Sequence, residues 1–67
     1  MSSQPSFEVG EMVRIRSGPF QAFTGRIEEV DNSESTLRVR VLIFGRYEPI
    51  ELGLEDVEKL GFPQEDN

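Results

Sequence analysis

Hydrophobic and polar side chains alternate along three segments of the chain, which is the pattern of half-buried β-strands. The longest segment, Leu37–Ile43, has a hydrophobic residue at every odd position and arginine at two of the positions between them. Met12–Ile15 and Glu48–Leu52 repeat the alternation over shorter stretches. Pro49 has no backbone N–H to donate, so it is expected at the start of its strand or on a sheet edge.

Two further segments depart from strict alternation. In Gly25–Asp31 the hydrophobic residues Ile27 and Val30 are three positions apart, and a regular strand would place them on opposite faces. We therefore expect a bulge or a sharp bend in this strand. In Leu54–Leu60 the hydrophobic residues also recur every three positions, which favours a single helical turn that leads into a short final strand.

Polar and glycine-containing segments separate the predicted strands. Phe44-Gly45-Arg46 is expected to form a tight turn whose glycine adopts a positive φ, and Asp31–Ser35 is expected to form a polar hairpin loop. Residues 1–6 are predicted to be a polar leader or a linker remnant, and residues 61–67 a flexible acidic tail. The folded domain is therefore expected over residues 7–60.

The number and length of these elements predict the fold class. Five short strands without a long helix leave the hydrophobic face of a flat sheet uncovered, so the sheet must curl on itself. The sequence therefore predicts an all-β fold: a small, partly open, five-stranded antiparallel barrel with one short helical turn. Its predicted core consists of Val13, Ile15, Ile27, Leu37, Val39, Val41, Ile50, Leu52, Val57 and Leu60.

The residue types that the chain lacks limit its chemistry. Its 67 residues are enough for one small domain, and they include neither Cys nor His. A disulfide, a thiolate or imidazole metal site, a Ser–His–Asp triad and a Cys nucleophile are therefore excluded. The paired acids Glu28-Glu29 and Glu55-Asp56 are expected to be solvated, since neighbouring strand residues point to opposite faces. We predict no enzymatic activity, no catalytic residue, no metal and no cofactor.

The charge of the chain points to protein partners. The formal net charge is −6, and it falls entirely on residues 47–67, where Lys59 stands against seven acids. Binding to a polyanion depends mainly on Lys and Arg that neutralise phosphates, so a nucleic acid partner is not expected. No hydrophobic run approaches the roughly 18 residues of a membrane span. We expect a monomer without a membrane association.

Aromatic residues are predicted to gather at one end of the sheet. In a meander, successive hairpin loops alternate between the two ends, so the loop at residues 18–24 and the turn at residues 44–46 share one end. These two connections carry Phe20, Phe23 and Phe44. A hydrophobic patch beside Arg46 would mark a protein contact. The alternative is that these rings fold inward and plug the open end of the barrel.

A set of short motifs runs in register from about Phe7 to Lys59. It consists of Glu8-Val9-Gly10-Glu11-Met12-Val13-Arg14-Ile15, Gly18-Pro19-Phe20-Gln21-Ala22-Phe23-Thr24-Gly25, Glu28-Glu29-Val30-Asp31, Ile43-Phe44-Gly45-Arg46, Pro49-Ile50-Glu51-Leu52 and Val57-Glu58-Lys59. This set resembles the KOW module at the C-terminus of bacterial NusG factors. Alternating strands around a glycine are a weak signal alone, whereas Gly-Pro-Phe and Ile-Phe-Gly-Arg at this separation are specific.

The resemblance implies an SH3-like (Tudor-like) barrel and a role in transcription elongation in the bacterial cytoplasm. In this family the C-terminal module docks other proteins: NusE, which is also a small-subunit ribosomal protein, and the termination factor Rho. These contacts serve transcription–translation coupling, antitermination or termination. RNA polymerase is contacted only through an N-terminal domain that is absent from this chain. The contact residues that the resemblance implies are Phe20, Phe23, Ile43, Phe44, Gly45 and Arg46.

A second function stays open, a KOW module that binds nucleic acid through an arginine-bearing strand face. The residues of that face would be Arg14, Arg16, Arg26, Arg38 and Arg40. The competing interpretation is a solvated face whose arginines pair with Glu28, Glu11 and Glu51 across the strands. Base stacking needs aromatic residues among the arginines, and none is expected within those strands. Protein docking is therefore the favoured function.

Overall fold

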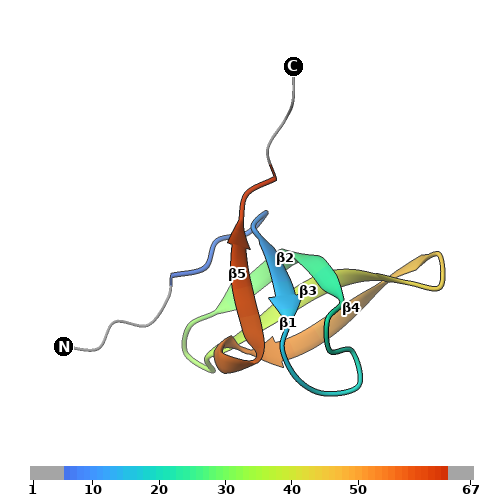
Figure 1. Cartoon of the computed structure of the whole chain (residues 1–67). Coiled ribbons are helices and arrows are strands. Elements are labelled where there is room, and N and C mark those ends of the chain that lie inside the picture. The colour runs from blue at the N-terminus through green and yellow to red at the C-terminus, as the bar shows by residue number, and fades with distance from the viewer. Residues whose placement is uncertain (1–5, 64–67) are drawn as a thin grey trace.

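The strands and the helical turn follow the predicted order along the chain. The computed structural model describes residues 6–63, so most of the predicted leader and tail lies outside the described residues. Its elements are β1 (Met12–Ile15), β2 (Thr24–Asp31), β3 (Thr36–Ile43), β4 (Arg46–Gly53), the 3₁₀ turn η1 (Leu54–Asp56) and β5 (Val57–Gly61). Figure 1 shows the strands wrapped into a strongly bent sheet. The helical turn that leads into a short final strand is confirmed.

The five strands form one antiparallel sheet in the order β4-β3-β2-β1-β5. Within the described residues β4 and β5 do not pair with each other, so the curled sheet is an open barrel rather than a closed one. Pro49 lies on β4, an edge strand, opposite Arg40 of β3. The predicted five-stranded antiparallel fold and the edge position of the proline are confirmed.

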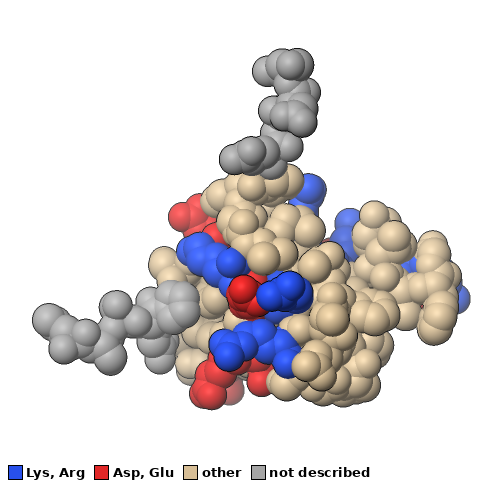
Figure 2. Space-filling model, in the orientation of Figure 1, with Lys and Arg blue, Asp and Glu red and all other residues tan. Residues whose placement is uncertain are grey.

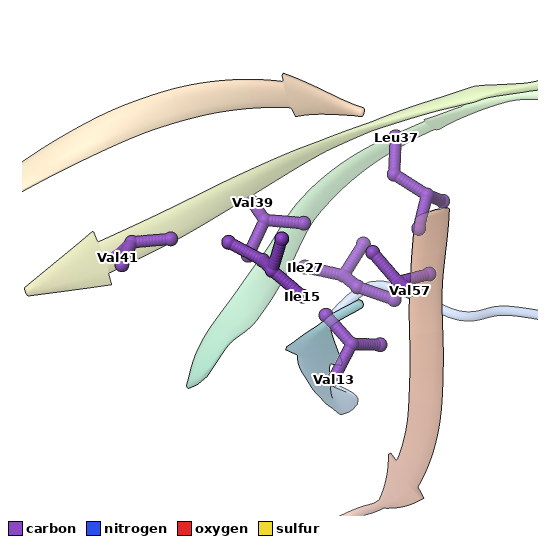
Figure 3. Close-up of a cluster of buried hydrophobic side chains, with 7 residues drawn as sticks. All are labelled: Val13, Ile15, Ile27, Leu37, Val39, Val41 and Val57. Atoms are coloured by element: carbon purple, nitrogen blue, oxygen red, sulfur yellow. The ribbon is translucent and has the colours of Figure 1, made fainter. Parts of the chain in front are cut away.

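The core lies inside the bend of the sheet and is made almost entirely of aliphatic residues. Figure 3 shows its buried members, which are Val13, Ile15, Ile27, Leu37, Val39, Val41 and Val57. Ile50 and Leu52 pack against this cluster while keeping some exposure. The prediction of Leu60 as a core residue was wrong, because its side chain is 48% exposed. Residues 57–61 are extended, so Val57 and Leu60, three positions apart, face opposite sides of β5.

The bulge predicted in the second strand is present in β2. Ile27 pairs with Val39 and Val30 with Leu37, and the register of β2 against β3 shifts between Ile27 and Glu29. The extra residue keeps Ile27 and Val30 on the same, inward face despite their odd spacing.

A buried carboxylate connects the segment before β1 to β5, which the sequence pattern did not reveal. Glu11 is 2% exposed. Its Oε1 accepts a hydrogen bond from the backbone N–H of Glu8 at 2.8 Å, and its Oε2 lies 3.1 Å from Nζ of Lys59. The Lys59 Nζ also lies 5.5 Å from the ring centroid of Phe7. One ion pair therefore holds the entering chain against the last strand.

We expect Glu11→Ala to lower the free energy of unfolding by about 1–3 kcal/mol, because the substitution leaves the Glu8 N–H without its acceptor. The lost ion pair adds little, since Lys59 is 44% exposed and also donates to the Ser6 carbonyl oxygen. Urea denaturation followed by circular dichroism measures the change. The matched control is Glu51→Ala, an exposed acid with an expected change within about 0.5 kcal/mol. Equal stabilities of the two variants would contradict the structural role of Glu11.

The loop between β2 and β3 is ordered by the carboxylate of Asp31. Its Oδ1 accepts hydrogen bonds from the Ser33 hydroxyl at 2.8 Å and from the backbone N–H groups of Ser33 and Glu34, both at 3.1 Å. These bonds favour the ionised form. The Ser33 hydroxyl first, and then the Glu34 N–H, hold the pKa of the Asp31 carboxyl below its ordinary value of 3.8.

We expect the Asp31 carboxyl to titrate below 3.8 when its chemical shift is followed by NMR against pH. Ser33→Ala should move this pKa back towards the ordinary value, whereas Asn32→Ala, which removes no hydrogen bond to the carboxylate, should leave it unchanged. Because the folded-state pKa is lowered, the contribution to stability is present above the unfolded pKa and is lost as the pH falls through the folded one. An unchanged pKa in Ser33→Ala would contradict this account.

Candidate protein-docking site

A two-residue turn between β3 and β4 presents the most exposed aromatic residue in the described part of the chain. Its two central residues, Phe44 and Gly45, have φ values of 51° and 79°. Positive φ at both positions defines a type I′ turn, whose twist matches the twist of the flanking strands. The positive φ predicted for Gly45 is confirmed. A phenylalanine at positive φ is uncommon, so the hairpin holds Phe44 in a conformation that its side chain does not favour.

The residues around this turn differ in how much they are buried against the core. Phe44 is 99% exposed. Ile43, on the inner face of β3, is half-buried and packs against the core cluster. Arg46 is exposed, and its Nε lies 4.0 Å from Oε2 of Glu48, a separation at which a surface ion pair contributes little. The turn thus presents an exposed aromatic ring and, two positions later, an exposed guanidinium.

The loop between β1 and β2 holds the other two predicted aromatic residues. Backbone hydrogen bonds join Ile15 N–H to the carbonyl oxygen of Phe23, and Ala22 N–H to that of Ile15, both at 2.8 Å. The rings of Phe20 and Phe23 meet edge to face, with centroids 6.1 Å apart. Phe20 packs against the core, whereas Phe23 is 39% exposed. The loop therefore holds two aromatic rings in contact, and one of them is partly exposed.

The three rings differ in how much of the core they cover. Phe20 covers the core, as the plugging alternative proposed, while Phe44 touches none of it. Phe44, at 99% exposure, packs against neither ring of the Phe20–Phe23 pair, and Figure 1 shows the β3–β4 turn projecting away from the loop between β1 and β2. In Figure 2 the β3–β4 hairpin stands out at the right, its end formed mostly of uncharged atoms.

The arginine-bearing face is partly neutralised by acids, although not by the pairs that were expected. Its shortest ion pairs join Arg40 to Glu28 at 3.4 Å, Arg38 to Glu29 at 3.0 Å and Arg14 to Glu58 at 2.5 Å. Of the three predicted partners only Glu28 pairs with an arginine. Glu11 pairs with Lys59 instead, and Glu51 lies opposite Arg38 without an ion pair within the described residues.

One aromatic residue on this face was missed. β4 begins at Arg46 rather than at Glu48, so Tyr47 lies within the strand and pairs with Leu42 of β3. The guanidinium of Arg40 lies 5.4 Å from the centroid of the Tyr47 ring. A two-residue turn at Phe44-Gly45 fixes this pairing, so hairpin geometry was the signal that could have placed Tyr47.

Over residues 6–63 the structure shows no cluster of three or more acidic, His or Cys residues able to hold a metal ion. Nor do these residues form a helix long and hydrophobic enough to span a membrane.

Comparison with known proteins identifies relatives of the domain. The KOW motif family matches residues 9–44. The chain is 56% identical over 54 residues to transcription termination/antitermination protein NusG of Vibrio vulnificus, covering 81% of this chain and 30% of the relative. It is 57% identical over 53 residues to the NusG of Escherichia coli K12, covering 79% of this chain and 29% of the relative. The chain thus spans about a third of the length of these relatives.

Solved structures show the same fold. A structure described as domain interaction in Thermotoga maritima NusG matches with a TM-score of 0.79 and 46% identity, covering 87% of this chain and 33% of the other. An MjSpt4:Spt5 complex matches with a TM-score of 0.78 at 23% identity, covering 91% of this chain and 42% of the other, and so supports the fold alone. The chain therefore belongs to the KOW family and is a KOW domain of the NusG type.

Proposed function

We propose that this domain is a protein-docking module of a NusG-type transcription elongation factor that acts in the bacterial cytoplasm. It binds NusE, Rho or both, and so links transcription to translation, antitermination or termination. The proposed contact residues are Phe20, Phe23, Ile43, Phe44, Gly45 and Arg46. The domain supplies binding rather than catalysis.

The single observation that carries the proposal is the state of Phe44. Its ring is 99% exposed, and its backbone is held at a φ of 51°. Neither feature stabilises the fold, since the ring buries no surface and a non-glycine residue at positive φ is disfavoured. Aromatic and arginine side chains are the residues that most often carry the binding energy of protein interfaces. A docking role explains both the exposed ring and the neighbouring Arg46.

The proposal is tested by measuring affinity for three separate partners. Fluorescently labelled domain is titrated with purified NusE, with purified Rho and with a single-stranded RNA, each at low and at moderate salt. We expect saturable binding to NusE or to Rho that changes little with salt, because contacts through Phe44 and its neighbours release few counterions.

The RNA arm of this experiment addresses the arginine-bearing face. Tight RNA binding that falls steeply with added salt, together with no binding to either protein, would overturn the docking proposal. It would favour the nucleic acid alternative, for which Tyr47 beside Arg40 supplies an aromatic ring that the sequence pattern did not show. The net charge of −6 and the acids paired to Arg38 and Arg40 argue against that outcome.

A further inference from the structure

We propose that a groove on the outer face of the sheet binds an acidic peptide segment that carries a large hydrophobic side chain. The groove has a volume of about 500 Å³ and crosses four strands. Its walls are Met12 from β1, Thr24 and Arg26 from β2, Arg40 and Leu42 from β3, and Tyr47 from β4. None of these residues belongs to the proposed docking site, so this inference does not rest on the proposed function.

The hydrophobic part of the groove is built on the β3–β4 hairpin. Leu42 and Tyr47 are direct cross-strand partners on the outer face, and they are 50% and 61% exposed. Met12, half-buried on β1, lines the opposite side. The volume falls within the range of roughly 300–1,000 Å³ that is typical of ligand pockets. It can accept a large side chain together with the adjoining backbone.

The charged part of the groove consists of two arginines, of which only one has a carboxylate partner. Arg26 and Arg40 are direct Cα partners in the β2–β3 ladder, a placement that is destabilising for like charges. Arg40 has Glu28 within 3.4 Å. Among the described residues no carboxylate lies within 4.0 Å of the Arg26 side chain. A carboxylate from a ligand would relieve this repulsion.

The arginines of the groove favour an acidic ligand, and its hydrophobic walls favour a peptide over a nucleic acid. One of the two arginines, Arg40, already has a carboxylate partner, and its guanidinium lies 5.4 Å from the centroid of the Tyr47 ring. A nucleic acid would gain few phosphate contacts here. A peptide can place a carboxylate beside Arg26 and a hydrophobic side chain against Leu42 and Met12, which uses both parts of the groove.

The test uses fluorescence anisotropy with three probes: a short peptide in which glutamates flank a central leucine–phenylalanine pair, the same peptide with glutamine in place of glutamate, and a short oligouridine. We expect the glutamate peptide to bind the domain at least tenfold more tightly than the other two. Arg26→Gln should weaken its binding about tenfold, the effect of losing one charge-assisted contact. Arg16→Gln, an exposed arginine outside the groove, should leave binding unchanged.

Further variants separate this site from the docking site. Arg26→Gln should weaken peptide binding without altering the affinity for NusE or Rho, and Phe44→Ala should leave peptide binding unchanged. Circular dichroism confirms that each variant is folded. Equal binding of the two peptides, absence of peptide binding at near-millimolar domain, or tighter binding of oligouridine would each overturn the proposal.

Discussion

Phe44→Ala is expected to weaken binding to NusE or Rho about 100-fold or more while leaving the domain as stable as before. A central aromatic anchor at a protein interface is worth about 2–4 kcal/mol on truncation, and 2.7 kcal/mol is about 100-fold in affinity. The ring is 99% exposed and buries nothing within the domain. Its loss therefore removes interface contacts without opening a cavity.

The measurement is a titration of each purified partner with wild-type and variant domain, combined with thermal unfolding of both. The matched control is Phe62→Ala, which truncates an exposed phenylalanine beside Gly10, outside the proposed contact set, and should not change affinity. A folded Phe44→Ala domain that binds like the wild type would contradict the docking role. Loss of the fold in this variant would show that the ring supports the barrel.

Gly25→Ala is expected to remove a large part of the domain's free energy of unfolding. A Cβ at position 25 would lie 2.5 Å from Cγ1 of Val39, 2.6 Å from the carbonyl oxygen of Arg40 and 2.9 Å from Cγ2 of Val41. The carbonyl belongs to the neighbouring strand β3, so it can move only if the β2–β3 pairing moves with it. Overpacking of this kind costs about 1–3 kcal/mol or more, while a domain of this size has a stability of only about 3–5 kcal/mol.

Thermal and urea unfolding followed by circular dichroism measure this effect. Thr24→Ala is the matched control, because the preceding residue on β2 is exposed and its truncation should change stability by no more than about 0.5 kcal/mol. A Gly25→Ala domain that melts within a few degrees of the wild type would contradict the close packing of β2 against β3.

The alternation of side chains was sufficient to predict the sheet because one face of each strand is buried. The bulge in β2 followed from the odd spacing of Ile27 and Val30, and the structure confirms it. Leu60 was misplaced because a spacing of three fits a helical turn, and the turn ends at Asp56 before the chain becomes extended. Glu11 could not be predicted as buried, since its ion-pair partner Lys59 comes within reach only after β1 and β5 pair.

The sequence located the aromatic residues of the candidate site in two connections between strands, and it left open which of the rings would be buried. Sequence alone left Phe44 either exposed or turned into the barrel, and the structure shows it 99% exposed. Whether a loop ring turns inward depends on the space left over the core, and Phe20 fills that space whereas Phe23 only partly does. Tyr47 was missed because the turn was assigned to residues 44–46, whereas a two-residue turn at Phe44-Gly45 starts β4 at Arg46 and pairs Tyr47 with Leu42.

The most direct test of the docking account is an amide chemical-shift titration of ¹⁵N-labelled domain with purified NusE, repeated with Rho. The account predicts that shifts concentrate at residues 18–25 and 43–47 for at least one of the two partners. Unchanged spectra with both partners at near-millimolar concentration, or shifts confined to the face that carries Arg14, Arg26 and Arg38, would contradict it.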